Sequence, residues 1–302
     1  LADIELMHYL LMPERAHKIE ILASTYLDIT LGEEKTVVQA DLFQESANSV
    51  NDNDTLFKEG AILLPLFHKL EEDLKRESLY SLYNEIEMPL ISVLAGMEQT
   101  GVKIDTIMLK NYSEKLTAEL FEIEDKIRDI AGDPTLNVSS PKQLSVLLYE
   151  KLKLDHKNGK EGKKALSTDE ETLSELEGEH PVIPLILEFR NIKKLISTYT
   201  DPLPLLISRK SGKLHTTFNQ ALTSTGRLSS VKPNLQNIPI RTERGREIRK
   251  AFIPSSPDGC IMSSDYSQIE LRLMAHISGD ENFIEAFRAG KDIHAATASR
   301  IF

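Results

Sequence analysis

The feature that most constrains the fold is a long amphipathic stretch at residues 106–131. Apolar side chains recur there at helical spacing, and charged residues occupy the opposite face. The stripe consists of Leu109, Tyr112, Leu116, Leu120, Ile123, Ile127 and Ile130. Gly132 follows it, and glycine commonly ends a helix. The pattern therefore predicts one long helix over residues 106–131.

Other helices are expected on both sides of this stretch. Residues 61–74 also carry apolar residues at helical spacing. Residues 87–90 read as a boundary, because Pro89 suits the first turn of a new helix, which would run over 90–99 and stop at Gly101.

Two capping patterns mark further helix starts. Ser140, Pro141 and Gln143 have the order of an N-cap, a first helical position and a capping box. A second box begins at Ser167 and ends at Glu170. Residues 1–204 are therefore expected to be mainly helical.

The pattern changes near residue 205. Residues 214–220 alternate as in a strand, and residues 260–264 form a short β-capable run after the turn at 257–259. A helical pattern then runs from about residue 267 to Gly279. These patterns predict an α+β fold, with a mainly helical part followed by strands.

Length and composition set further limits. A chain of 302 residues with 40% hydrophobic residues can form about two domains. It begins at Leu1 and ends inside a helical pattern, so we expect a fragment. A single cysteine, Cys260, excludes an internal disulfide and fits a reducing cytosol, which predicts a cytoplasmic protein. No signal peptide and no apolar run long enough to span a membrane is found.

The charge is unevenly distributed. The net charge is −11, but residues 1–90 hold 18 acidic and 7 basic residues, whereas residues 201–302 hold 14 basic and 10 acidic ones. Residues 226–252 are strongly basic, and 156–164 are rich in glycine and lysine. A phosphate-binding surface and a solvated loop are both compatible with either segment.

Asp265 is the strongest candidate for chemistry. A carboxylate between a strand and a helix is well placed for catalysis, and with the adjacent carbonyl it could hold Mg²⁺. The alternative is that Asp265 or Ser267 caps the next helix, with Glu270 closing a capping box.

The segment at 265–272, DYSQIELR, resembles the first palm motif of bacterial family A DNA polymerases. Other segments resemble that family in the same order, from about Glu87 to Phe302, and the resemblance is weaker before it. They are 139–144 and 194–201 in the thumb, 225–230 and 234–241 in the palm, and 290–294 before the fingers.

The resemblance implies three parts. Residues 1–84 would be the C-terminal remnant of a 3′–5′ exonuclease-like domain. Residues 85–204 would begin the polymerase domain and form a helical thumb. Residues 205–302 would form the first part of an antiparallel β-sheet palm that leads into the fingers.

The implied activity is DNA-directed DNA synthesis in replication and repair, by two-metal nucleotidyl transfer with two Mg²⁺ ions. The partners would be primer–template DNA and deoxynucleoside triphosphates, with no membrane, and the intact enzyme would be a monomer. The family's second catalytic aspartate and its fingers helix lie beyond Phe302. We therefore expect this chain alone to bind DNA but to lack activity.

The resemblance also assigns residues to the nucleotide site. Asp265 would be a catalytic, metal-binding aspartate, and the carbonyl of Tyr266 would help to hold the metal. Glu270 would be the steric gate beneath the sugar. The remaining nucleotide-binding residues would be Gln268, Ile269, Arg241 and His294. For His294, a buried structural role is the alternative.

A second set is assigned to DNA. Arg227 would contact the minor groove at the primer terminus, where acceptors are common to every base pair. The other DNA-binding residues would be Asn234, Gln236 and Asn237 in the palm, and Ser140, Lys142, Arg190 and Lys194 in the thumb. For all of them, roles in turns and caps are the alternative.

Two further hypotheses concern function. A non-catalytic DNA-binding or scaffold module is the rival to an enzyme. Proofreading is expected to be absent, because Leu56 and Gly60 stand where proofreading relatives have a tyrosine and a metal-binding aspartate. A shifted alignment onto Asp52 or Asp54 would restore that motif.

Overall fold

The computed structural model describes residues 2–31, 52–154, 167–290 and 293, with the main chain alone at 52–56. The described chain forms two units, residues 1–255 and residues 256–302, and each is described by itself. The predicted Gly-Lys segment at 156–164 lies outside the described residues.

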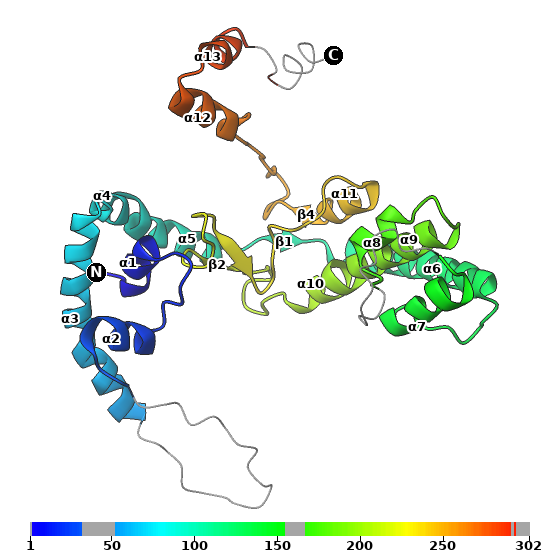
Figure 1. Cartoon of the computed structure of the whole chain (residues 1–302), viewed down its shortest axis with the longest axis horizontal. Helices are drawn as coiled ribbons and strands as arrows, with labels where there is room; N and C mark the ends of the chain where they lie inside the picture. The colour runs from blue at the N-terminus through cyan, green and yellow to red at the C-terminus, as the bar shows by residue number, and fades with distance from the viewer. Residues whose placement is uncertain (1, 32–51, 155–166, 291–292, 294–302) are drawn as a thin grey trace, which may run out of the picture. The chain divides into compact units, whose positions relative to one another are not determined.

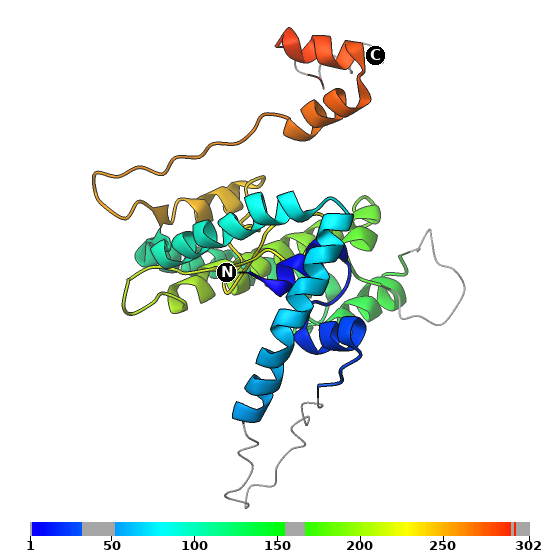
Figure 2. The same ribbon diagram turned by 90° about the vertical axis from the view of Figure 1, so that its left-hand side faces the viewer.

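Three helices begin the first unit: α1 (Ile4–Leu11), α2 (Ile19–Leu27) and α3 (Asp52–Arg76). α1 and α2 both pack against α3 (Figure 2). α1 begins at Asp3, whose carboxylate accepts from the Leu6 amide at 2.9 Å. Met7, Leu66 and Leu70 are fully buried between these helices. The predicted helix at 61–74 is confirmed as part of α3.

The helix start predicted at residues 87–90 is confirmed, because α5 (Met88–Thr100) begins there with Pro89 in its first turn, but no break in helical structure precedes it. One continuous helical segment passes through this region, made of α4 (Tyr80–Leu82), the π-helical turn η1 (Tyr83–Glu87) and α5. Pro89 lies in the first turn of α5, directly after the π-helical turn. The end at Gly101 is confirmed. Its φ of +61° favours glycine, and a Cβ there would lie 2.7 Å from the Leu214 carbonyl.

The predicted long helix is confirmed as α6 (Thr106–Ala131). Asp105 caps it by accepting from the Met108 amide at 2.9 Å, and Gly132 ends it with φ +60°. α6 lies beside α9 (Val182–Leu195) (Figure 1). Leu109 and Leu116 of α6, with Ile186 of α9, are fully buried in the largest core cluster of the described residues.

The remaining helical pieces of this region are short. They are α7 (Pro141–Ser145), η2 (Val146–Lys151), α8 (Glu170–Glu175), η3 (Ile196–Thr200), α10 (Pro202–Leu205) and α11 (Glu243–Arg249).

The two capping patterns hold only in part. Ser140 caps α7, but the Gln143 side chain accepts from the Asn137 amide at 2.7 Å, because the Ser140 amide already donates to the Asn137 carbonyl. Asp169, not Ser167, caps α8 by accepting from the Thr172 amide at 2.8 Å.

Strands are few and antiparallel. β1 (Lys103–Ile104) pairs with β4 (Phe252–Ile253), and β2 (Thr217–Asn219) pairs with β3 (Ser229–Val231). β2 confirms the centre of the predicted strand at 214–220. The described chain is therefore mostly helical with small antiparallel sheets, and none of its described helices is long and apolar enough to cross a membrane.

The second unit holds α12 (Ile269–Ser278) and α13 (Glu281–Arg288). Ala275 and Ile293 are the buried apolar residues described in it, and the Arg272 guanidinium lies 4.6 Å from the centre of the Phe287 ring. The strand predicted at 260–264 is absent, because no described segment pairs with it and a strand needs a partner for its main-chain hydrogen bonds.

Candidate nucleic-acid interface

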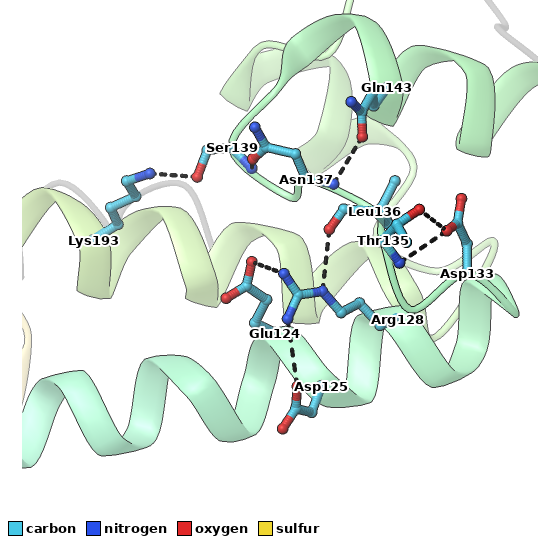
Figure 3. Close-up of polar contacts among 10 residues, drawn as sticks. All are labelled: Glu124, Asp125, Arg128, Asp133, Thr135, Leu136, Asn137, Ser139, Gln143 and Lys193. Carbon is cyan, nitrogen blue, oxygen red and sulfur yellow. Dashed lines mark hydrogen bonds and ion pairs between the residues drawn. The ribbon is translucent and has the colours of Figure 1, made fainter.

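The loop between α6 and α7 is held by side-chain hydrogen bonds (Figure 3). Arg128 donates from Nε to the Leu136 carbonyl at 3.1 Å and pairs with Glu124 at 2.8 Å. The Asp133 carboxylate accepts from the hydroxyl and the amide of Thr135, and these bonds lower the pKa of Asp133. Because these bonds fix the loop, Ser139 and Ser140 at its end have defined positions.

Of the two serines, Ser139 contacts α9. Lys193 donates from Nζ to the Ser139 hydroxyl (Figure 3) and also lies 5.8 Å from the centre of the Phe189 ring. Ser140 uses its hydroxyl to cap α7, accepting from the Gln143 amide at 3.4 Å. Lys142 and Lys194 are exposed.

Ser139, Lys142, Lys193 and Lys194 line one open groove with a volume of about 1440 Å³, whereas Ser140 is not among its lining residues. Its walls come from α7, η2, the segment before α8, α9 and the start of η3. Among its polar residues, hydroxyl and basic groups outnumber the two acidic ones, Glu150 and Asp169; they are Ser139, Ser145, Ser167, Thr168, Ser197, Lys142, Arg190, Lys193 and Lys194. Hydroxyls and ammonium groups are the donors that proteins present to nucleic-acid phosphates. The groove brings together three residues predicted to bind DNA, namely Lys142, Arg190 and Lys194.

Arg190 is placed differently from its neighbours. Its guanidinium donates to the Thr168 carbonyl and, at 3.2 Å, to the Thr168 hydroxyl, and burial lowers its pKa. Next to it, the Ser167 hydroxyl and the Thr172 amide lower the pKa of Asp169 to about 2. Arg190 therefore ties the start of α8 to α9, so its contacts place it in the wall of the groove.

The predicted palm residues lie in a folded loop around β2 and β3. The hydroxyls of Thr216 and Ser230 are 2.6 Å apart, and the Ser230 amide donates to the Gln236 side chain at 3.0 Å. Asn234 accepts from the Gln236 amide at 3.0 Å. These side chains stabilise the loop through hydrogen bonds within it. Such bonds are what the alternative interpretation, a role in turns, predicts for them.

Two other predicted residues are bonded through their main chains. The Asn237 carbonyl accepts from the Tyr199 hydroxyl of η3, and the Arg227 carbonyl accepts from Thr223 at 2.7 Å. The Arg227 side chain is exposed, next to Gly226, whose φ is +79°. The main chain is thus anchored at an exposed position.

Much of the basic stretch at 226–252 is used internally. Arg249 donates to the carbonyls of Ile238 and Pro239 at 3.1 and 3.2 Å, and Arg246 donates to the Arg241 carbonyl at 3.0 Å. Lys250 pairs with Glu247, and Arg244 pairs with two glutamates. Lys232 and Arg241 have exposed side chains. The net charge of the stretch therefore overstates what it offers to a phosphate.

The second unit carries the residues predicted for catalysis. Asp265 and Tyr266 are exposed in an irregular segment, and the Tyr266 side chain is 80% exposed. α12 starts after Gln268, which has a left-handed φ of 54° and makes no side-chain cap. Capping by Asp265 or Ser267 is therefore wrong as an account of this helix start.

The nucleotide-site residues follow directly. Ile269 and Glu270 open α12, both with exposed side chains, while His294 lies outside the described residues. A carboxylate such as Asp265 suits Mg²⁺, but the described part of the chain contains no group of three aspartate, glutamate, histidine or cysteine side chains that could hold a metal. The described residues alone therefore do not form a metal cage.

Three residues with defined contacts were not predicted from the sequence. Lys193 lines the groove beside Lys194, and its position in a basic pair was the available signal. The bonds of Tyr199 and Arg244 join residues far apart in the chain, and no local pattern indicates them.

The sequence model of DNA polymerase family A matches residues 106–302, so this chain belongs to that family. Its bacterial relatives carry the name DNA polymerase I. It is 43% identical to the protein of Geobacillus stearothermophilus over 310 residues, which covers 99% of this chain and 34% of the relative. It is 49% identical to the protein of Bacillus subtilis over 250 residues, covering 83% and 28%.

A solved structure agrees with this assignment. The POL domain of Pol1 from M. smegmatis, in complex with DNA primer-template and dNTP, superposes with a TM-score of 0.85 at 35% identity. The match covers 99% of this chain and 49% of the other. The family resemblance predicted from the motifs is therefore confirmed, and the chain spans about a third of the length of these curated relatives.

Proposed function

We propose that this chain is part of a DNA-directed DNA polymerase of the DNA polymerase I type, acting in replication and repair. In the proposed reaction, a primer 3′-hydroxyl attacks the α-phosphate of a deoxynucleoside triphosphate, and pyrophosphate leaves. The observation that carries the proposal is the groove, where hydroxyls and lysines gather on a chain of this family. The solved relative is described with primer-template DNA and dNTP, which supports the same partners.

The domain assignment is part of this proposal. Residues 1–84 would be an exonuclease-like remnant, residues 85–204 the start of the polymerase domain with the thumb, and residues 205–302 the start of the palm. The groove would then hold backbone phosphates on the thumb. Arg227 and Asn237 would touch the primer–template, and Arg241 the triphosphate. We also propose a cytoplasmic monomer for the longer protein.

The nucleotide site is proposed for residues 265–270. Asp265 and the Tyr266 carbonyl would supply oxygen ligands to Mg²⁺, which stabilises the charge of the reacting phosphates when bound. Glu270 would pack beneath the sugar and exclude a 2′-hydroxyl, with Gln268 and Ile269 beside it. His294 would contact the phosphates. Because the described residues form no metal cage, we assign the complete reaction to the longer polymerase.

The test is a fluorescence titration of the 302-residue chain with primer–template DNA at low and high salt. We expect weak binding without sequence preference, falling steeply with salt, because phosphate contacts release counterions. Lys142→Ala with Lys194→Ala should weaken binding and reduce the salt slope. Lys58→Ala with Lys75→Ala, in α3, is the charge-matched control. Binding that is absent at low salt, or equal at both salts, contradicts the proposal.

A further inference from the structure

Three helices of the first unit meet at one arginine. Arg244 of α11 donates from Nε to Glu119 of α6 at 3.1 Å, and its Nη2 lies 2.8 Å from Glu188 of α9. The three side chains are 37%, 31% and 40% exposed, so each is partly withdrawn from water. Burial lowers the pKa of Arg244, but the hydrogen bond that Arg244 donates to Glu188 and the charge of Glu119 outweigh it, so the pKa is raised. Two carboxylates thus share one guanidinium.

The main chain of the same residue is also held. Tyr112 of α6 donates its hydroxyl to the Arg244 carbonyl at 3.1 Å. Tyr112, Glu119, Glu188 and Arg244 are called the Arg244 cluster below. α6 therefore bonds to Arg244 twice, through Tyr112 to its carbonyl and through Glu119 to its guanidinium. These bonds fix the position of the N-terminal turn of α11.

α11 in turn fixes the segment that precedes it. Arg249 donates to the carbonyls of Ile238 and Pro239, and Arg246 donates to the carbonyl of Arg241. α11 also packs closely against this segment, because a Cβ on Gly245 would lie 2.4 Å from the Pro239 side chain. A continuous set of contacts therefore links α6 and α9 to residues 238–241 through Arg244.

We propose that Arg244 is a positioning residue. Through the Arg244 cluster it sets how residues 227–241 are presented relative to the groove that contains Lys142 and Lys194, so that both surfaces engage one duplex. This inference rests on the proposed function, because it assigns a role in DNA binding. Arg244 itself need not touch DNA, since its guanidinium is already occupied by two carboxylates.

Removing negative charge from the cluster distinguishes a positioning role from a purely electrostatic one, because the two predict opposite changes in DNA affinity. Glu119→Ala with Glu188→Ala removes two negative charges and should by electrostatics alone tighten binding to a polyanion. Positioning by the cluster predicts the opposite, a weakening of about fivefold for primer–template DNA, the scale of a small ion-pair network. Glu114→Ala with Glu122→Ala makes the same charge change at exposed positions of α6 outside the cluster. It should leave affinity unchanged or slightly raised.

Arg244→Lys adds a variant that keeps the charge. A lysine cannot bond both glutamates in the fork geometry of a guanidinium, so we expect an intermediate loss of affinity. Thermal unfolding of each variant verifies that it is folded. In DNA-free protein, the cluster variants should also exchange amide hydrogens faster within α11, with α6 unchanged. A variant that merely unfolds would raise exchange in both helices.

The outcomes are distinct. Unchanged or tighter binding by the Glu119 and Glu188 double variant, while the unsubstituted chain binds, overturns the role of Arg244 and leaves the proposed function standing. Unchanged exchange in α11 overturns it as well. If the unsubstituted chain does not bind primer–template DNA, the proposed function and this role both fail.

Discussion

The two units of this chain differ in how far they bury the apolar side chains of their helices. In the first unit, the apolar face of α6 is covered by α9, and side chains such as Leu116 and Ile186 are fully buried. In the second unit, α12 packs with α13, and Met262 and Ile277 remain 85% and 80% exposed. The difference teaches that helical periodicity does not by itself produce a core.

The same contrast applies to the polar residues. Around the groove, hydrogen bonds hold the loop of residues 132–140, and Arg190 and Tyr199 fix neighbouring segments. Asp265 has no comparable setting, because its segment is irregular and exposed. A site functions when its supporting residues hold it in place. The structure therefore gives the groove in the first unit, which we propose as the DNA-binding surface, a rigid setting that the segment around Asp265 in the second unit lacks.

Matched leucines give the largest expected difference between the units. Leu116→Ala removes a fully buried side chain of α6 and should lower the free energy of unfolding by about 2–5 kcal/mol. Leu273→Ala removes a side chain of α12 that is 52% exposed and should cost about 0.5 kcal/mol or less. Urea unfolding followed by circular dichroism measures both. Equal losses would break the comparison.

Matched histidines give the next effect. His8 of α1 is 3% exposed, and its Nδ1 lies 2.7 Å from the Nδ1 of His17. Burial, then the charges of His17 and Arg15, lower the pKa of His8 from 6.5 to about 4. The unfolded chain therefore takes up a proton first as the pH falls. Stability from a neutral His8 is complete above pH 6.5 and is lost between there and about pH 4.

His8→Gln should flatten this pH dependence, with a change on the order of 2 kcal/mol across the window. His276→Gln, an exposed histidine of α12, should leave it as in the unsubstituted chain. Urea midpoints measured between pH 7 and pH 4 provide the comparison. A pH dependence that is the same in all three proteins would show that His8 is not held neutral by its surroundings.

Matched tyrosines give the smallest effect. The hydroxyl of Tyr199, a residue 4% exposed, donates to the Asn237 carbonyl. Tyr199→Phe should therefore cost about 1 kcal/mol and speed amide exchange in residues 236–239. Tyr266→Phe, at a residue 80% exposed, should change neither quantity. If Tyr199→Phe also changes neither, this bond does not anchor the segment.

The sequence predicted those elements that local chemistry determines. α6 has its apolar stripe, its cap at Asp105 and its terminating Gly132 within the helix and its ends, so its bounds could be read directly. The groove residues Lys142 and Lys194 came from family motifs, and the structure brings them to one surface.

The failures have a shared physical cause. A strand at residues 260–264 depends on a partner strand, which is not a local property. The sequence predicted Ser167 as the N-cap of α8, but the N-cap is Asp169. The Ser167 hydroxyl instead donates to the Asp169 carboxylate. Arg244 joins glutamates far away in the sequence, and such a network follows only from tertiary packing.

The most direct test of the central claim is primer extension by the 302-residue chain, with Mg²⁺ and all four deoxynucleotides at high protein concentration. We predict that the chain binds the primer–template and does not extend it. It carries Asp265, but its described residues hold no group of three metal-ligating side chains, and each missing electrostatic partner costs orders of magnitude in rate. Template-dependent extension that disappears in Asp265→Asn would contradict this account, because it would show a complete catalytic site within these residues.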